Sequence, residues 1–278
     1  MNIERILNNN VVCVKEENAE VIVMGKGIGF QKKPGNAVDE RLVEKKFRME
    51  NDSEVNKFFK LVEDIPQEHL RISMTIIDYA KTVMPKRLGN SLYVSLTDHI
   101  NFAIERAKNG MLFENPLLEE VRGFYPSEYL VGEYGVALIE RELGVKLPID
   151  EAASFAMHIV NAEYTGDMNT TMHVTELIRE VLALVEDELG IHLNEMGLYY
   201  SRFLTHLKFL AQRIFTGQLM DNQDEEFIRM ISELYPKEFE ISTKIGDLIF
   251  EKYKKRITRE EMVYLTVHIR RIQPGVTK

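Results

Sequence analysis

The stretch TDHINF at residues 97–102 returns in similar form as LTHLKF at residues 204–209. The two stretches are 107 positions apart, and an arginine follows each histidine by seven positions, as Arg106 and Arg213. Similarity at a fixed offset is the mark of an internal duplication. These residues therefore indicate that a segment of the chain occurs twice.

A second pair of stretches supports the duplication. FAMHI at residues 155–159 and LTVHI at residues 265–269 are 110 positions apart, and two acidic residues precede each of them, at 150–151 and 260–261. The similar offsets predict a module of about 105 residues, present in two copies. The polar, turn-rich stretch at 165–171 marks the boundary between the copies.

Hydrophobic residues recur at helical spacing from the stretch NDS at 51–53 to the end of the chain, which predicts that this whole part is α-helical. Proline and glycine residues break the pattern at the positions where helices are expected to end. The clearest predicted helices cover residues 55–63, 91–108, 134–143, 149–162, 175–189, 195–215, 227–235, 239–255 and 259–271.

The first 50 residues differ, because short runs rich in valine and isoleucine are separated by asparagine-rich turns. They predict four strands at residues 2–7, 11–15, 21–24 and 42–49. A four-stranded meander without a helix buries little surface by itself, so we expect it to be stabilised as a homodimer. The predicted fold class is a small N-terminal antiparallel β-sheet followed by two homologous all-α helical bundles.

The composition is that of a globular protein, with 278 residues, 45% of them hydrophobic and 28% charged. Cys13 is the single cysteine and has no partner for an intramolecular disulfide. The N-terminal residues lack the apolar run of a secretory signal, and no stretch approaches the roughly 18–20 apolar residues of a membrane span. We expect a cytoplasmic protein that does not insert into the membrane.

The net charge of −9 is unevenly distributed. Residues 1–50 contain nine Lys and Arg and eight Asp and Glu residues, whereas residues 51–278 contain 26 and 36. The segment 26–38 contains Lys26, Lys32 and Lys33 and no acidic residue. This positive segment is either a phosphate-binding site or a solvated lysine cluster, and charge alone does not decide between them.

Four of the seven histidines occupy equivalent positions of the duplicated module, namely His99, His158, His206 and His268. On a helical wheel they lie at the edge of the apolar face. One interpretation is that they are packing histidines that were copied with the module. The other is that a neutral imidazole at this edge accepts a phosphoryl group as a nucleophile, which would make each module a switch.

The other three histidines, His69, His173 and His192, have no equivalent in the repeat, and we expect them on the surface. Asp98, next to His99, either orients the imidazole or is a solvated helix residue.

Metal and catalytic motifs are missing from the sequence. It contains no His-x-x-x-His or Cys-x-x-Cys spacing and no nucleophile elbow. We therefore expect no enzyme activity, no catalytic residue, no metal site and no cofactor.

Several motifs together resemble one known family. NNN at residues 8–10, VMGKGIGFQKK at 23–33, SLTDHINFA at 95–103, HIVNAE at 158–163 and THLKF at 205–209 occur in the order found in the BglG/LicT/SacY family of bacterial transcriptional antiterminators. The resemblance covers essentially the entire chain. It implies an RNA-binding co-antiterminator domain at residues 1–56 and two regulation domains of the sugar phosphotransferase system at 57–169 and 170–278.

The resemblance implies a function for each part. The dimeric N-terminal domain would bind an RNA hairpin in a leader transcript and prevent the overlapping terminator from forming. His99 and His158 would be an inhibitory pair phosphorylated through the sugar-specific permease (enzyme II). His206 and His268 would be an activating pair phosphorylated by the phosphocarrier HPr. Overall likeness favours a β-glucoside operon.

The N-terminal residues supply groups that suit RNA. Proteins recognise RNA loops by stacking on aromatic side chains and by hydrogen bonds to base edges and 2′-hydroxyls, and they bind phosphates with cations. Phe30 is either a stacking residue or part of the sheet core. The predicted RNA-binding residues are Arg5, Asn8, Asn10, Gly25, Lys26, Gly27, Phe30, Gln31 and Lys32, with Lys33 as a further phosphate contact.

Two details of this segment qualify the assignment. Gly25, Gly27 and Gly29 fit a bulged or tightly turned strand better than a nucleotide-binding loop, because no helix follows them. Many relatives have arginine where this chain has Lys26, and lysine does not reproduce a bidentate guanidinium contact. We therefore expect Lys26 to contact phosphate rather than a base.

Two other classes of protein are considered. A DNA-binding activator with the same regulation domains would need a helix-turn-helix, whereas residues 1–50 are predicted as strands. A metal-dependent phosphohydrolase would need bound metal.

Overall fold

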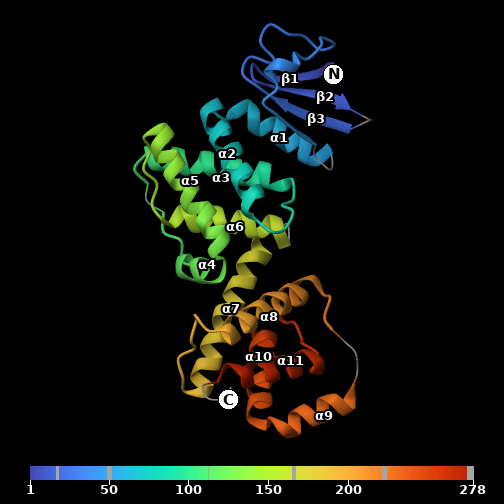
Figure 1. Cartoon of the computed structure of the whole chain (residues 1–278), viewed down its shortest axis with the longest axis vertical. Coiled ribbons are helices and arrows are strands. Elements are labelled where there is room, and N and C mark those ends of the chain that lie inside the picture. The colour runs from blue at the N-terminus through green and yellow to red at the C-terminus, as the bar shows by residue number, and fades with distance from the viewer. Residues whose placement is uncertain (17–18, 49–51, 112, 165–166, 221–223, 274–278) are drawn as a thin grey trace. The chain divides into compact units, whose positions relative to one another are not determined.

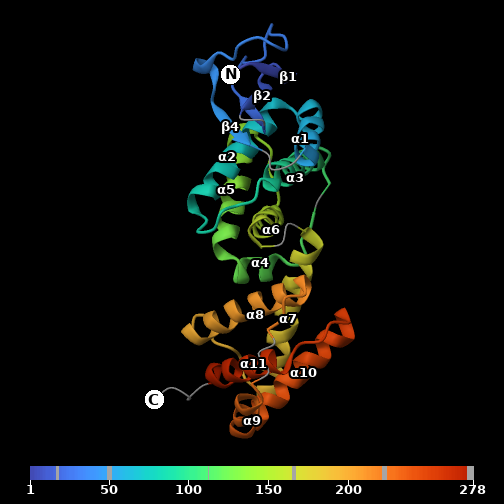
Figure 2. The ribbon, with the colours of Figure 1, turned by 90° about the vertical axis from the view of Figure 1, so that its right-hand side faces the viewer.

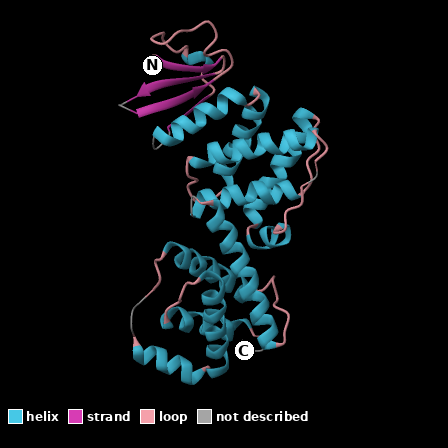
Figure 3. Cartoon of the chain, turned by 180° about the vertical axis from the view of Figure 1, so that it is seen from behind, coloured by secondary structure: helices cyan, strands magenta, loops and turns pink. Residues whose placement is uncertain are grey.

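The computed structural model describes residues 1–16, 19–48, 52–111, 113–164, 167–220 and 224–273. The chain divides into two compact units, Met1–Gly166 and Asp167–Lys278. All strands of the described residues lie at the N-terminal end of the first unit, and the remainder is helical (Figure 3). This agrees with the predicted fold class.

The N-terminal sheet is antiparallel with the strand order β1-β2-β3-β4. The first three strands match their predicted positions closely. The fourth is shorter than predicted, because residues Glu40–Leu42 form a 3₁₀ turn instead of extended strand. The side chain of Asp39 caps the start of this turn. The strands are β1 (Ile3–Asn8), β2 (Val11–Glu16), β3 (Ala19–Met24) and β4 (Lys45–Arg48).

Both faces of this sheet are covered by the chain itself. On one face, Val12 and Val23 pack with Ile28 and Val38 from the segment between β3 and β4. The other face belongs to the core that contains Phe58 of helix α1 (Asp52–Asp64), which lies along the sheet in Figure 1. The sheet therefore does not depend on a second copy for burial, and the physical reason given above for dimerisation is not needed.

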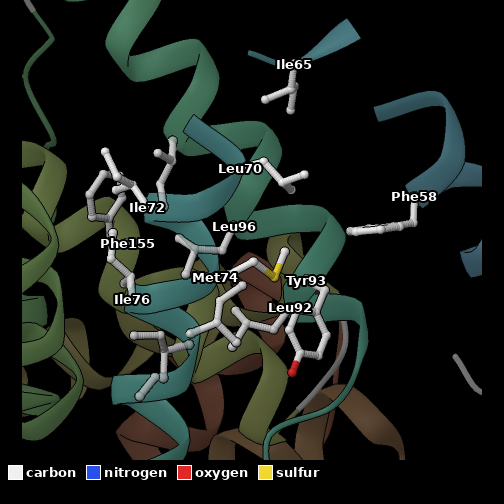
Figure 4. Close-up of a cluster of buried hydrophobic side chains, with 14 of the residues drawn as sticks. Phe58, Ile65, Leu70, Ile72, Met74, Ile76, Leu92, Tyr93, Leu96 and Phe155 are labelled. Carbon is white, nitrogen blue, oxygen red and sulfur yellow. The ribbon is translucent and has the colours of Figure 1, made fainter. Parts of the chain in front are cut away.

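The first helical bundle follows α1. Helix α6 packs against both α3 and α5, and the core that these helices share with α2 contains Ile72, Ile76, Leu92, Leu96 and Phe155 (Figure 4). Its helices are α2 (Gln67–Val83), α3 (Ser91–Lys108), α4 (Leu118–Phe124), α5 (Pro126–Leu143) and α6 (Asp150–Tyr164).

Sequence periodicity predicted the regions of α2 and α4 as helical but did not define these two helices, and it placed the start of α5 eight residues too late. In α2, isoleucine and threonine residues weaken the intrinsic helix signal, which tertiary packing overrides. In α5, Gly132 lowers the apparent helix propensity. A Cβ atom at this position would lie 2.0 Å from the Ala152 carbonyl oxygen, so glycine permits the close contact of α5 with α6.

The second unit repeats this arrangement, with α11 between α8 and α10 (Figure 2). A proline at the first turn begins both α5 and α10, as Pro126 and Pro236, at an offset of 110 residues. The helices are α7 (Met168–Leu189), α8 (Leu198–Thr216), α9 (Glu225–Leu234), α10 (Pro236–Tyr253) and α11 (Arg259–Ile272). None of the described helices has the length and apolar character needed to cross a bilayer.

Candidate functional site

Backbone hydrogen bonds join the two polar loops that the sequence predicts to bind RNA. The Gly25 N–H donates to the Asn10 carbonyl at 2.9 Å, and the Gly29 N–H donates to the Asn9 carbonyl at 3.0 Å. The Gly27 N–H donates to Asn10 Oδ1 at 2.6 Å, and Gly27 has a φ of 74°, which favours glycine. The glycine segment is therefore a tight turn that lies against the β1–β2 turn, as predicted.

Beyond this turn, aromatic and polar side chains face solvent. Phe30 is 57% exposed, so it is not part of the sheet core. Gln31 is exposed and has a φ of 54°, an uncommon conformation for a residue other than glycine. Lys26 and Lys33 are exposed and Lys32 is partly buried. The structure thus brings together an exposed aromatic ring, an amide and three lysines.

Asn8 and Asn10 are held by other groups of the first unit. Asn8 Nδ2 donates to the Val62 carbonyl at 3.3 Å, and Asn8 Oδ1 accepts from the Asn10 N–H at 2.8 Å. Asn10 Nδ2 donates to Oε1 of Gln67 on α2. A cleft of about 520 Å³ lies at this point and is lined by Asn8, Asn10 and Lys26 on one side and by Gln67 and Arg71 on the other.

Arg5 does not contact this loop cluster in the structure. Its guanidinium lies 4.2 Å from the ring centroid of Phe59 on α1, as in a cation–π contact. Arg5 therefore helps to hold α1 against the sheet.

The four repeated histidines form two pairs, one in each unit. In the first unit, His99 of α3 and His158 of α6 have ring centroids 4.8 Å apart. Burial and the neighbouring His99 lower the pKa of His158 to about 3. His158 Nδ1 is buried and has no hydrogen-bond partner among the described residues. His158 is therefore neutral at physiological pH.

A buried carboxylate stands behind this pair. Glu151 of α6 is only 1% exposed, and its Oε2 accepts a hydrogen bond from His99 Nε2 at 3.0 Å. Its other oxygen accepts from the guanidinium of Arg106. With the Nε2 proton held in this way, Nδ1 of His99 carries the lone pair. Asp98 is exposed, so the carboxylate that orients His99 is Glu151.

The second unit has the corresponding pair. His206 of α8 and His268 of α11 have ring centroids 4.5 Å apart, with the rings nearly parallel at 22°. Burial, His268 and Arg213 lower the pKa of His206 to about 4. Burial together with Arg271 and Arg202 also lowers the pKa of His268. His206 and His268 are therefore neutral at physiological pH.

The second carboxylate is bound differently. Glu261 of α11 is fully buried and accepts two hydrogen bonds from Arg213, at 2.8 and 2.7 Å, in a bidentate ion pair. The Met220 N–H also donates to Glu261, at 3.2 Å. His206 Nε2 has no partner among the described residues.

Glu151 and Glu261 were not predicted as site residues, although both belong to stretches that recur in the repeat. Arg106 and Arg213 each follow a repeated histidine by seven positions, and the acidic pairs recur at the second offset. The structure shows that these repeated residues form a buried ion pair next to each histidine pair.

The prediction that His69 lies on the surface is wrong. His69 of α2 is 2% exposed, and its Nδ1 lies 2.7 Å from Asn101 Oδ1. A run of polar neighbours in the sequence concealed its position on the inner face of the helix. His173 and His192 are exposed, as predicted.

One group of potential metal ligands is found among the described residues, formed by Glu4, Cys13 and Glu20 of the sheet. Burial and the two glutamates raise the pKa of the Cys13 thiol to about 12, so the thiol is protonated at neutral pH and is a poor metal ligand. The histidine pairs lie elsewhere, on the helical bundles.

The geometry of the pairs suits imidazoles that act as nucleophiles. A neutral imidazole attacks phosphorus through its lone pair, and the product gains close to two negative charges. Placing that charge among buried side chains is unfavourable unless cations approach or the packing changes. Phosphorylation of either pair would therefore require approaching cations or a change in the local packing.

Comparison with known proteins places these features in one family. Residues 1–56 match the CAT RNA binding domain, and residues 74–162 and 179–272 each match the PRD domain. The transcription antiterminator LicT of Bacillus subtilis (strain 168) is 42% identical, over 98% of this chain and 99% of its own. The β-glucoside operon antiterminator of Dickeya chrysanthemi is 40% identical, over 98% and 97%.

A solved structure shows the same architecture in the first part of the chain. The crystal structure of GlcT CAT-PRDI is 32% identical to the matched region with a TM-score of 0.53, and it covers 58% of this chain and 97% of its own. The N-terminal sheet, the duplicated helical unit and these full-length similarities lead to one conclusion. The chain belongs to the family of transcription antiterminators that combine a CAT RNA binding domain with two PRD domains.

Proposed function

We propose that the chain binds an RNA hairpin in a leader transcript and thereby prevents formation of a transcription terminator. The observation that carries this proposal is the loop cluster at one end of the sheet, where Phe30 and Gln31 are exposed next to three lysines. Bases stack on an exposed aromatic ring, amides reach base edges, and ammonium groups bind phosphates. Proteins of this family regulate transcription and are not enzymes.

The proposed domains are residues 1–56 for RNA binding and residues 57–169 and 170–278 for regulation. The matched family regions and the division of the chain near residue 166 support these limits. We further propose that the chain acts as a homodimer in the cytoplasm. This proposal rests on the resemblance to the antiterminator family and not on burial of the sheet, whose faces the chain itself covers. One relative is a β-glucoside operon antiterminator, which supports a β-glucoside operon as the target of this chain.

The proposed RNA-binding residues divide into two groups. Phe30, Gln31, Lys26 and Lys32 face solvent or are partly exposed, and they would contact RNA directly. Asn8 and Asn10 with Gly25 and Gly27 would shape the loop, since their hydrogen bonds connect the two turns. The Asn10 amide would contact RNA only after leaving Gln67. Arg5 would contribute to RNA binding only after leaving the ring of Phe59.

We propose that the histidine pairs regulate this binding through phosphorylation. His99 and His158 would be the inhibitory pair that responds to the sugar-specific permease, and His206 and His268 the activating pair that responds to the phosphocarrier HPr. Their ring separations of 4.8 and 4.5 Å and the lowered pKa values of His158 and His206 support the assignment, because neutral paired imidazoles are available as nucleophiles.

RNA binding is tested with the full chain and a hairpin that contains an unpaired internal loop, at near-physiological salt. Replacing Phe30 by alanine should weaken binding about 10- to 100-fold, the usual effect of losing one stacking residue. The control is Phe250→Ala, which removes an exposed aromatic ring from the second unit. Equal affinity for duplex DNA would instead favour the DNA-binding activator.

The switch is tested by replacing His206 and His268 together with alanine. Phosphorylated HPr should then no longer increase antitermination, because the second unit has lost both acceptors. The matched double variant of His99 and His158 should remain active when sugar is absent. Undiminished activation of the first variant by HPr would overturn the assignment of the second pair.

A further inference from the structure

The two histidine pairs occupy equivalent positions of the repeat but have different neighbours. Four residues before the first histidine of the pair, the second unit has Arg202 where the first unit has Ser95. Three residues after the second histidine, it has Arg271 where the first unit has Asn161. The second pair is therefore flanked by two guanidinium groups that the first pair lacks.

Both arginines lie one helical turn from a histidine. Arg202 and His206 are at i and i+4 on α8, and His268 and Arg271 are at i and i+3 on α11, spacings that place side chains on one helix face. The two imidazole rings are 4.5 Å apart, so these spacings place both arginines on the helix faces that carry the histidine pair. The positive charges of Arg271 and Arg202 both act on His268, whose pKa they lower.

These two guanidinium groups are available for a ligand. Arg202 and Arg271 are exposed, and neither forms an ion pair within the part of the chain that the structure describes. Arg213, the other arginine near this pair, is already bound to Glu261 by two hydrogen bonds. Unpaired guanidinium groups next to a nucleophile are suited to hold phosphate oxygens, which they bind with two parallel hydrogen bonds.

The first pair offers the opposite environment. His99 already donates to the carboxylate of Glu151, and Arg106 is bound to the same carboxylate. Asn161 is buried and Ser95 is partly buried, and neither carries charge. A phosphoryl group that approaches His99 therefore meets no unpaired guanidinium at these positions.

We propose that Arg202 and Arg271 are phosphoryl-binding residues that hold the oxygens of a phosphoryl group during its transfer to His206 or His268. The inference rests on the proposed function, in which these histidines accept phosphate. It follows that the second pair accepts a phosphoryl group even from a small donor. The first pair needs cationic groups that are supplied by the donor protein.

The transfer is the displacement of an amine from phosphorus. An imidazole nitrogen attacks phosphorus, the new N–P bond forms, and the bond from phosphorus to the donor nitrogen breaks. With phosphoramidate as the donor, the leaving group is ammonia, and the proton on the other imidazole nitrogen passes to it. Guanidinium groups stabilise the charge on the peripheral oxygens throughout this step.

The test uses the full chain and phosphoramidate without any carrier protein. The phosphohistidine formed on each pair is measured over time by peptide mass spectrometry under alkaline conditions. We expect His206 and His268 to be phosphorylated faster than His99 and His158. The double variant R202Q/R271Q should lower the rate at the second pair by about 10- to 100-fold, the usual scale for lost charge-stabilising donors. The rate at the first pair should stay unchanged and serves as an internal reference.

A matched control removes another exposed arginine of the second unit, Arg229 of α9, by R229Q. This variant should retain the wild-type rate at both pairs. An unchanged rate at the second pair in R202Q/R271Q would overturn the inference while leaving the proposed function intact. Wild-type chain that gains no phosphohistidine from phosphoramidate or from phosphorylated HPr would overturn both.

Discussion

Glu151 and Glu261 show how much a single buried residue contributes to these sites. Each is almost fully buried, and each neutralises an arginine that is itself largely shielded, Arg106 or Arg213. Removing one member of a buried ion pair leaves an uncompensated charge in the protein interior. The carboxylates therefore fix the position of the histidine-bearing helices as well as the local charge.

Replacing Glu261 by glutamine should lower the free energy of unfolding of the second unit by about 3–5 kcal/mol, because the Arg213 guanidinium loses its counter-charge. Urea denaturation followed by circular dichroism measures the effect. The control is Glu105→Gln, which breaks an exposed pair with Lys108 and should change stability by less than about 0.5 kcal/mol. Similar losses in the two variants would contradict the buried ion pair.

The lowered pKa values of the histidines predict a pH dependence. The pKa of His206 is about 4 in the folded chain and 6.5 when unperturbed, so the unfolded state binds the proton first as pH falls. The contribution of His206 to the free energy of unfolding is therefore fully present above pH 6.5. It is lost between about pH 6.5 and 4, by at most about 1.4 kcal/mol per pH unit.

Urea midpoints at pH 7, 6 and 5 should therefore fall less steeply for His206→Gln than for the wild type. His158, whose pKa is about 3, should behave in the same way in the first unit, down to about pH 3. His192→Gln is the matched control, because His192 is fully exposed and its replacement should leave the pH slope unchanged. Identical slopes for all variants would show that these rings are not buried in solution.

Among the helices and strands, the sequence predicted those whose pattern is local. The first three strands and α3, α6, α8 and α11 were found from alternation or helical spacing close to their observed positions. The misses have a common cause in tertiary contacts. Helix α2 is held by packing despite its β-branched residues, and Gly132 in α5 is explained only by the backbone of α6, which packs against it.

The same limit applies to the candidate sites. Repetition identified the four histidines, and turn chemistry placed Asn10 and Gly27 in tight loops. Neither signal revealed the hydrogen bond between Glu151 and His99, because residues 52 positions apart meet only when α3 packs on α6. The burial of His69 was missed for the same reason.

The contact between α5 and α6 predicts the effect of a single methyl group. Gly132→Ala should lower the free energy of unfolding by about 1–3 kcal/mol, because the new Cβ would overlap the Ala152 carbonyl. Gly123→Ala in α4 is the matched control, since nothing lies within 4 Å of its Cβ position. That substitution should be neutral or stabilise by up to about 1 kcal/mol. Thermal unfolding of the two variants distinguishes the cases.

At the scale of the whole molecule, an acidic chain carries a local positive site. The net charge is −9, whereas Lys26, Lys32 and Lys33 gather around one exposed loop. Such a distribution gathers positive charge at one end of the sheet, while the net negative charge opposes non-specific binding of nucleic acid elsewhere. It also makes the strength of RNA binding dependent on ionic strength.

Each lysine that contacts phosphate should contribute about 0.7–0.9 to the slope of log affinity against log salt concentration. Lys32→Gln should reduce this slope by about one unit per site and weaken binding similarly for different hairpin sequences. Lys60→Gln, which removes an exposed lysine of α1, should leave the slope as it is. Titrations between 50 and 300 mM salt, roughly the useful range, provide the measurement. An unaltered slope for Lys32→Gln would exclude this lysine from the interface.

The hydrogen bond between Asn10 and Gln67 predicts a competition with RNA. Gln67→Ala should raise RNA affinity about 2- to 10-fold, since a net hydrogen bond is worth about 0.5–1.5 kcal/mol. Thr75→Ala, which changes another side chain of the same cleft, should have no such effect, because its hydroxyl bonds within its own helix. Unchanged affinity in Gln67→Ala would mean that RNA does not compete with Gln67 for the Asn10 amide.

Through that same bond, RNA binding at Asn10 would be coupled to the width of the cleft between the sheet and α2. If RNA binds the Asn10 amide, Gln67 is released and the cleft is free to widen. Conversely, closing the cleft lowers the affinity for RNA by the factor by which RNA binding disfavours the closed cleft. The reciprocity is thermodynamic and needs no long-range rearrangement. A nascent transcript is then an effector of the first helical bundle as much as the bundle is an effector of the transcript.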